Sequence, residues 1–266
     1  MQFRRPLVAI ALAVSVIASL AGVGQSEAAY QLGAPEKVLQ GTITVSAASS
    51  LSDSFTEIAK AFRKINPNTK IRFNFGSSSS LVAQIQAGAP SDVIASADLS
   101  NIAALIKSGE VASASYPKIF ARNQMAIAVK PGNPLKIYSL EDFARAKYVA
   151  LCGITAPCGV YAAQVLAKAK VSINESKITR AVDAKSTLNA VAVGDADAAI
   201  VYFTDALAAK KIVTLIKIKF DQNVNTSYAI AAIRLSRNLA TAEAFINYVV
   251  SDSGQAILKS FGFAKK

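Results

Sequence analysis

Apolar and polar positions alternate along this chain in short blocks that predict strands followed by helices. A strand-like apolar run over residues 42–47 precedes a helical pattern that starts at about residue 50. Apolar residues recur in that pattern at spacings of three and four, as on a helix with one buried face: Leu51, Phe55, Ile58, Phe62 and Ile65. Asn66-Pro67 ends the helix, because a proline cannot continue it.

The same order of elements repeats through the rest of the chain. A strand over 70–75 precedes a helix from about 79, and a strand over 92–96 precedes a helix over 99–108. A strand-like run over 125–129 then ends in the turn-forming sequence Lys130-Pro131-Gly132-Asn133-Pro134. Beyond this turn the pattern predicts strands over 148–151, 198–202 and 228–233, and helices from about 159, from about 184, over 240–250 and over 253–260. The chain is therefore predicted to be α/β.

Two α/β lobes joined by two extended crossings account for this order of elements. We place the boundaries so that residues 29–121 plus 234–266 form lobe I and residues 122–233 form lobe II. A single open sheet is the alternative, because the hydrophobic pattern alone does not separate the two arrangements.

Two of the predicted strand-to-helix corners are rich in small hydroxyl residues. The first corner reads Ser46-Ala47-Ala48-Ser49-Ser50-Leu51, and the second reads Phe75-Gly76-Ser77-Ser78-Ser79-Ser80-Leu81. A helix N-terminus carries unpaired N–H groups and a partial positive charge, so such a corner can hold an anion without any charged side chain. The structural alternative is that these serines only cap helices or line solvated turns.

The first 28 residues have the pattern of an export signal. Arg4 and Arg5 precede an apolar run over 7–23, and Ser26-Glu27-Ala28 supplies the small residues that a signal peptidase requires, so cleavage is expected after Ala28. A membrane anchor is the alternative, but the run is short and is diluted by Ser and Gly. The flanks of the arginine pair fit a twin-arginine signal poorly. The mature chain is therefore expected to be exported, to the periplasm or the outer face of the cytoplasmic membrane.

Composition narrows the chemistry further. The formal net charge is +12, yet Lys and Arg are scattered and form neither a dense basic tract nor a nucleic-acid motif, so nucleic acid is not an expected partner. The chain has no His, which removes the commonest general base and the commonest metal ligand. These features favour a binding protein that steers small anions over an enzyme.

Five short motifs follow one another in order along the chain. They are ITVSAASSL at 43–51, FGSSS at 75–79, AGAPSDV at 87–93, SAD at 96–98 and IVYFTDA at 200–206, and Phe261-Gly262-Phe263 follows near the end. Together they resemble the periplasmic molybdate-binding proteins of ABC importers, over essentially the whole mature chain. The resemblance implies a type II solute-binding fold with two lobes, each a mixed sheet flanked by helices, and a cleft between the lobes that closes on a tetrahedral dianion.

The matching motifs also imply which residues hold the anion. Ser50 and Ser78 would contribute side chain and N–H, Cys158 and Ala184 would contribute main-chain N–H groups, and Tyr202 would contribute its phenol. Molybdate is fully deprotonated near neutral pH and offers only acceptors, so a site made of donors matches it. Neutral donors also avoid burying an unpaired Lys or Arg in the empty protein. No cofactor and no protein ligand to a metal ion are expected.

The two cysteines, Cys152 and Cys158, are six residues apart. A zinc or redox motif would have two intervening residues and further ligands. In an exported protein a disulfide is expected instead, and closing so short a loop should contribute about 2 kcal/mol. Asp92 and Asp98, which could be imagined as an acid/base pair, are expected to serve capping or loop hydrogen bonding.

These inferences predict a monomeric receptor that captures molybdate, and also tungstate, and delivers it to an ABC permease and ATPase at the membrane. Three alternatives stay open. One is a receptor for sulfate, thiosulfate or another tetrahedral oxyanion, because donor chemistry does not separate these anions. The second is a serine hydrolase using Ser50 or Ser78 with a lysine base, although no lysine lies at a diagnostic spacing from either serine. The third is an envelope-surface adhesion module that uses the basic charge.

Overall fold

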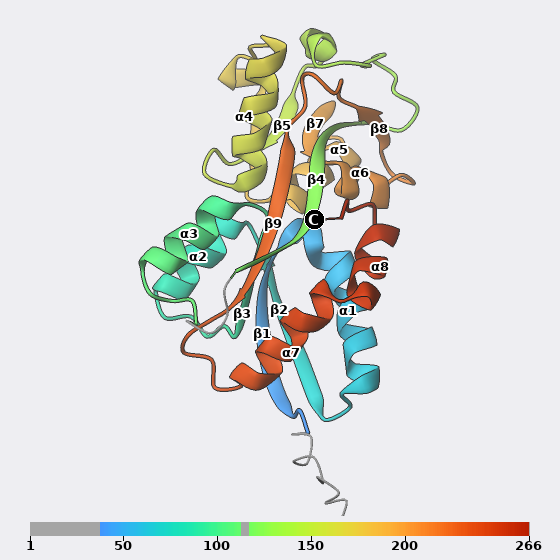
Figure 1. The fold of residues 1–266 in the computed structure, drawn as a ribbon. Coiled ribbons are helices and arrows are strands. Elements are labelled where there is room, and N and C mark those ends of the chain that lie inside the picture. The colour runs from blue at the N-terminus through green and yellow to red at the C-terminus, as the bar shows by residue number, and fades with distance from the viewer. Residues whose placement is uncertain (1–37, 113–116, 266) are drawn as a thin grey trace, which may run out of the picture. The chain divides into compact units, whose positions relative to one another are not determined.

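Strands that alternate with helices build the fold in a computed structural model, which describes residues 38–112 and 117–265 (Figure 1). The predicted leader, residues 1–28, lies outside the described residues. The strands are β1 Gly41–Ala48, β2 Thr69–Gly76, β3 Val93–Ser96, β4 Lys118–Val129, β5 Val149–Cys152, β6 Ile178–Ala181, β7 Ala198–Tyr202, β8 Thr214–Lys217 and β9 Asn225–Ala232. The α-helices are α1 Ser52–Ile65, α2 Ser78–Gln86, α3 Leu99–Lys107, α4 Pro157–Ala169, α5 Ala184–Ala192, α6 Phe203–Ala208, α7 Leu239–Val250 and α8 Asp252–Ser260.

Hydrogen bonding joins these strands along one continuous path, in the order β2-β1-β3-β9-β4-β7-β5-β6, with β8 paired to β4. Pairing is parallel for β1 with β2 and β3, and for β5 with β6 and β7; β9 and β4 run antiparallel to their neighbours. The first part of β4, residues 118–124, pairs with β9, whereas residues 125–129 pair with β7 and β8. Two sets of parallel strands are thus linked through β4 and β9, and the predicted mixed α/β class is confirmed.

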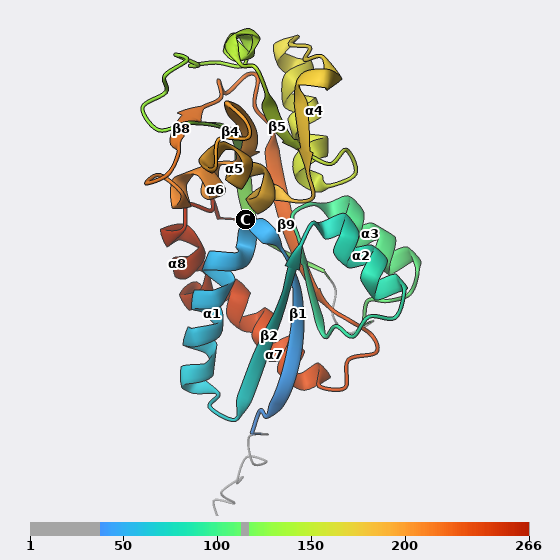
Figure 2. The same ribbon diagram turned by 180° about the vertical axis from the view of Figure 1, so that it is seen from behind.

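Helices pack on both faces of the strands. In the set that contains β1, helices α2 and α3 cover one face and α1, α7 and α8 the other (Figures 1 and 2). Successive strand residues face opposite sides, so Val93 and Ala95 join the large core while Ile94 joins the smaller core beneath α2 and α3. The same alternation in β7 directs Ile200 and Tyr202 into the large core and Val201 into the core that includes α5 residues.

The predicted elements are found within a few residues of their expected bounds, with one exception, and some short elements were not predicted. The strand expected at 125–129 starts at Lys118, and β6, β8 and α6 were not predicted. These three are short and only partly buried or irregular in pattern, so their apolar residues give no clear period. In the part of the chain that the structure describes, no helix is long and apolar enough to cross a membrane.

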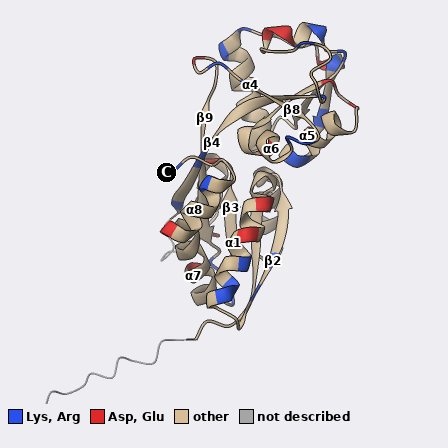
Figure 3. Ribbon diagram, turned by 90° about the vertical axis from the view of Figure 1, so that its right-hand side faces the viewer, with Lys and Arg blue, Asp and Glu red and all other residues tan. Residues whose placement is uncertain are grey.

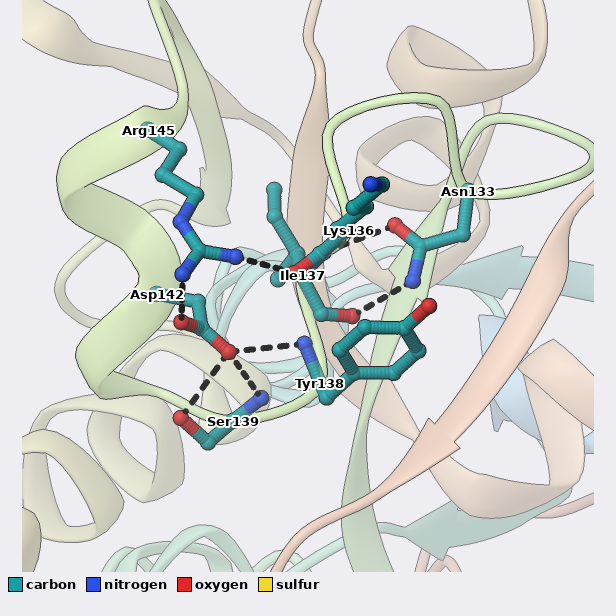
Figure 4. A network of polar contacts seen from close by, with 7 residues as sticks. All are labelled: Asn133, Lys136, Ile137, Tyr138, Ser139, Asp142 and Arg145. Carbon is teal, nitrogen blue, oxygen red and sulfur yellow. Dashed lines mark hydrogen bonds and ion pairs between the residues drawn. The ribbon is translucent and has the colours of Figure 1, made fainter.

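A polar network fixes the connection from β4 to β5 (Figure 4). The Asn133 side chain donates to the Ile137 carbonyl at 2.8 Å and accepts from the Ile137 N–H at 2.9 Å. Asp142 accepts from the N–H groups of Tyr138 and Ser139 and pairs with Arg145 at 3.3 Å. The backbone hydrogen bond from Tyr138 is the main reason why the pKa of Asp142 is lowered. Among the described residues, Lys and Arg occur both in the part of the molecule that contains α1 and in the part that contains α4 (Figure 3).

Candidate functional site

Every predicted ligand residue stands at or just beyond the carboxyl end of a strand that belongs to a parallel pair. In chain order the strand and residue are β1 with Ser50, β2 with Ser78, β5 with Cys158, β6 with Ala184 and β7 with Tyr202. Parallel strands end at the same edge of a sheet, and α/β proteins bind ligands beyond that edge. The topology therefore gathers residues that are more than 150 positions apart in sequence at a single place.

All five predicted residues line one small cavity. Its other lining residues are small and uncharged: Ala48, Ser49, Gly76, Ser77, Ala97 and Pro157. The space open to the centre of a water-sized sphere is about 10 Å³, which is room for about one water molecule. Among the described lining residues there is no Lys, Arg, Asp or Glu.

Ser78 reaches the cavity from the first position of α2. Its side chain is buried, and its oxygen accepts a hydrogen bond from the Ala97 N–H at 3.0 Å. The helix is capped by the preceding residue, because the Ser77 oxygen accepts from the Ser80 N–H at 3.2 Å. Ser77 therefore caps the helix, and Ser78 does not. The hydroxyl hydrogen of Ser78 can be donated to another group.

Ser50 lies in a short 3-10 helix, η1 (Ser49–Leu51), that follows β1. Its hydroxyl oxygen is 2.9 Å from the hydroxyl of Tyr228, a residue of β9 that is completely buried. The Asn123 amide donates to the Tyr228 oxygen at 3.4 Å and to Thr204 at 2.8 Å. If Tyr228 donates onward to Ser50, the Ser50 hydrogen is available to the cavity.

Tyr202 is the last residue of β7, and its side chain is 1% exposed. Within residues 38–112 and 117–265 its hydroxyl has no hydrogen-bond partner. Burial raises its pKa well above the usual value, and the neighbouring Tyr228 raises it further, so the phenol stays a neutral donor. A buried polar group without a partner costs about 1–3 kcal/mol, a cost that a ligand oxygen at this position would relieve.

Cys152 and Cys158 form a disulfide that ties the end of β5 to the first turn of α4. Pro157 occupies the first position of α4, where its missing N–H costs nothing. The Cys158 N–H lies in the first turn and has no partner within the helix. The next position requires glycine, because a Cβ on Gly159 would lie 2.1 Å from the Gly153 carbonyl oxygen. Local sequence thus holds this turn close to the strand end.

Ala184 begins α5, and its N–H is likewise a first-turn donor without a partner within the helix. The preceding Asp183 caps the helix by accepting from the Ser186 N–H at 2.8 Å. The cap fixes the start of α5, so the position of the Ala184 amide does not depend on its own side chain.

A buried carboxylate, Asp205, lies three residues beyond Tyr202 in the first turn of α6. It is 1% exposed, and neither oxygen has a well-formed hydrogen bond within the described residues. Burial raises its pKa to about 7, with Lys185 opposing the shift and Asp53 and Asp183 adding to it. Asp205 is therefore only about half ionised at pH 7 and brings less negative charge to this part of the molecule than an ordinary aspartate would.

The two aspartates that could be imagined as an acid/base pair have structural partners. Asp98 caps α3 by accepting from the Asn101 N–H at 3.1 Å, and Asp92 accepts from the Thr44 N–H at 2.7 Å and the Ser236 hydroxyl at 2.6 Å. Neither lines the cavity. Among the described residues no group of three or more Cys, Asp and Glu side chains could hold a metal ion.

Sequence reasoning missed Tyr228, Asn123 and the Ala97 amide as supports of the site. The only signal for Tyr228 was a tyrosine in an apolar strand, since a buried phenol needs a hydrogen-bond partner. Which partner it finds depends on where β9 passes η1, and that is a property of the assembled sheet.

Comparison with known proteins identifies the family of the chain. The model of the family described as bacterial extracellular solute-binding protein matches residues 43–264. The molybdate-binding protein ModA of Mycobacterium tuberculosis (strain ATCC 25618 / H37Rv) is 34% identical over 251 residues, which cover 94% of each chain.

Solved structures show the same fold. The substrate-binding domain of a putative molybdenum ABC transporter from Clostridium difficile has a TM-score of 0.63 at 27% identity, covering 85% of this chain and 99% of that one. The sulfate-binding protein SubI of Mycobacterium tuberculosis H37Rv has a TM-score of 0.76 at 19% identity, covering 85% and 87%. The chain belongs to the family of bacterial extracellular solute-binding proteins.

Proposed function

We propose that this protein captures molybdate for import by an ABC transporter and performs no chemistry on it. The observation that carries the proposal is the cavity lined only by neutral groups, in which Ser50, Ser78 and Tyr202 present hydroxyls beside the first turns of α4 and α5. A relative that is 34% identical over nearly the whole chain is named a molybdate-binding protein, and this supports the same ligand here.

The donor set favours an anion that carries no proton. A carboxylate in the wall would accept a proton from hydrogen phosphate but would repel a bare oxyanion, and the described wall contains none. Each charge-assisted hydrogen bond contributes about 1.5–3 kcal/mol. Several such bonds permit binding below micromolar concentration. Tungstate offers the same acceptors as molybdate, so we expect it to bind as well.

Hydrolysis by Ser50 or Ser78 is less well supported. A serine nucleophile needs an adjacent general base, and no lysine or carboxylate lines the described cavity. The bonds that Ser50 and Ser78 do make, to Tyr228 and to the Ala97 N–H, orient the hydroxyls without activating them.

We further propose that the protein works outside the cytoplasm and binds the anion by closing two lobes. Residues 1–28 would direct export, and the mature monomer would work outside the cytoplasmic membrane with a permease and an ATPase. Residues 29–121 plus 234–266 and residues 122–233 would act as two lobes that close on the anion, with β4 and β9 as the crossings. No cofactor is required, and the bound molybdate itself is the cargo.

Thermal melting with molybdate, tungstate, sulfate and phosphate tests this function. A ligand at a hundred times its dissociation constant should add about 2.7 kcal/mol to the free energy of unfolding, or roughly 5–10 °C to the Tm of a domain of this size. We expect shifts with molybdate and tungstate that exceed those with sulfate and phosphate. A larger shift with sulfate would identify a sulfate receptor, and no shift with any of the four would refute the proposal.

A further inference from the structure

An ion pair joins the two sides of the cavity. The Lys185 Nζ lies 2.6 Å from the Asp53 Oδ2, and the two side chains are 34% and 49% exposed. Asp53 is in the first turn of α1, three residues after Ser50, and Lys185 directly follows Ala184 in the first turn of α5. Helix α5 also contacts η1, and Figure 2 shows α5 above the end of β1 that leads into α1. The pair therefore links the segment that carries Ser50 to the segment that carries the Ala184 N–H.

Lys185 is poorly placed for the stability of its own helix. A cation in the first turn opposes the helix dipole, whereas an anion there is stabilising. Asp183 already caps α5 by accepting from the Ser186 N–H, so the helix does not need Lys185. Asp53, in contrast, is well placed in the first turn of α1. The position of Lys185 is explained by its partner on the other side of the cavity.

The size of the cavity indicates that its two sides must separate. Its free space holds about one water molecule, and a tetrahedral anion of five heavy atoms is larger than that. Entry and release of the anion therefore require the η1 segment and the start of α5 to move apart, and the ion pair opposes this movement.

We propose that the Lys185–Asp53 pair is a latch that holds the anion cavity closed, an inference that rests on the proposed anion-binding function. Both residues are positioning residues, because neither lines the cavity. The latch slows release of the anion and raises its affinity by stabilising the closed arrangement. The pair is partly exposed, so the effect is modest, about two- to fivefold in the dissociation constant.

Neutralising each partner separately distinguishes a latch from a simple effect of charge on the anion. A charge effect alone would make Lys185→Met weaken molybdate binding and Asp53→Asn strengthen it. The latch makes both variants release molybdate about two- to fivefold faster in stopped-flow measurements, and makes the double variant no worse than either single one. Tighter binding by Asp53→Asn, or additive losses in the double variant, would overturn the latch.

A matched control comes from a second exposed ion pair, Arg180–Glu175, which lies at 2.8 Å within one set of strands. Glu175→Gln breaks this pair without touching the cavity, and its release rate should equal that of the unmodified protein. The exchanged pair Asp53→Lys with Lys185→Asp should restore slow release.

A measurement without ligand separates failure of the latch from failure of the proposed function. Spin labels on Ile65→Cys in α1 and Val193→Cys after α5 occupy exposed positions in the two parts that the pair joins. In the ligand-free protein, Lys185→Met and Asp53→Asn should each shift the distance distribution toward longer values by pulsed electron spin resonance. Unchanged distributions would overturn the latch even if molybdate binds. Longer distances without any molybdate binding would support the latch while refuting the proposed ligand.

Discussion

The hydroxyl oxygen of Ser78 accepts a hydrogen bond from the backbone N–H of Ala97, 3.0 Å away. The two residues belong to different strand-to-helix corners, after β2 and after β3. Because the oxygen already serves as an acceptor, the hydroxyl hydrogen can be donated elsewhere, and Ser78 lines the candidate cavity. A hydroxyl held in this way acts as a donor of fixed direction.

Replacement of Ser78 by Ala should therefore weaken molybdate binding strongly. The variant loses one charge-assisted hydrogen bond of about 1.5–3 kcal/mol, or roughly 10- to 150-fold in the dissociation constant. Isothermal titration measures the loss. Ser80→Ala is the matched control, because Ser80 is exposed in the same turn of α2. Equal affinities for the two variants would remove Ser78 from the site.

Sequence could predict this part of the site because the information is local. A strand that runs into a hydroxyl-rich corner and then into a helix specifies an N-terminus with free N–H groups, and the structure has such N-termini after β1 and β2. Sequence could not tell which serine caps α2, since Ser77 and Ser78 are chemically identical neighbours. Backbone dihedral angles decide it: Ser77 is extended and caps the helix, and Ser78 lies within it.

The residues that support the cavity from other strands could not be predicted, because their positions depend on the order of the strands in the sheet. Tyr228 supports Ser50 only because β9 lies between β3 and β4. The Lys185–Asp53 pair likewise spans 132 positions, and no periodicity links such positions. Short elements such as β6 and β8 were missed for another reason, because their partial burial leaves no regular apolar pattern.

Reduction of the disulfide should lower stability and weaken binding modestly. Opening the Cys152–Cys158 loop should cost about 2 kcal/mol, or roughly 4–8 °C in Tm. Affinity should fall only a few-fold, because Pro157 and Gly159 still form the turn that carries the Cys158 N–H. Melting and titration with and without a phosphine reductant measure both effects, and Cys152→Ser with Cys158→Ser should reproduce them. An unchanged Tm would contradict the expected stabilisation.

Asp205 should make the folded protein less stable as the pH rises from about 4 to about 7. Its pKa is raised to about 7 by burial, so over this range the folded chain keeps a proton that the unfolded chain has lost. The penalty in the free energy of unfolding grows by at most about 1.4 kcal/mol per pH unit and levels off about one pH unit above the folded pKa.

The Asp205→Asn variant tests this pH dependence. Urea unfolding between pH 5 and pH 8 should show a flatter stability profile for the variant than for the parent protein. The carboxyl of Glu141 has a pKa lowered from 4.5 to about 2, mainly by a backbone hydrogen bond. Its contribution to stability is lost as the pH falls from about 4.5 to about 2, which lies below the range tested. If the stability of the variant and that of the parent protein changed with pH in parallel, Asp205 would be ionised throughout this range.

Two tyrosines whose rings lie 5.7 Å apart should respond to loss of the hydroxyl in opposite ways. In the described structure the Tyr202 hydroxyl is buried without a partner, whereas the Tyr228 hydroxyl bonds to Ser50 and Asn123. Tyr202→Phe should therefore leave the ligand-free protein as stable as before or raise its free energy of unfolding by about 1 kcal/mol, because it removes an unsatisfied group. The same change should cut molybdate affinity by at least about tenfold.

Tyr228→Phe should instead lower the stability of the ligand-free protein by about 1–3 kcal/mol, because Ser50 loses its hydroxyl partner and Asn123 keeps only its bond to Thr204. Its effect on affinity should be smaller than that of Tyr202→Phe, since Tyr228 reaches the anion only through Ser50. Denaturant unfolding gives the stability of each variant, and titration gives the molybdate affinity of each. A Tyr202→Phe protein that is destabilised yet binds molybdate normally would show that this phenol serves the core and not the anion.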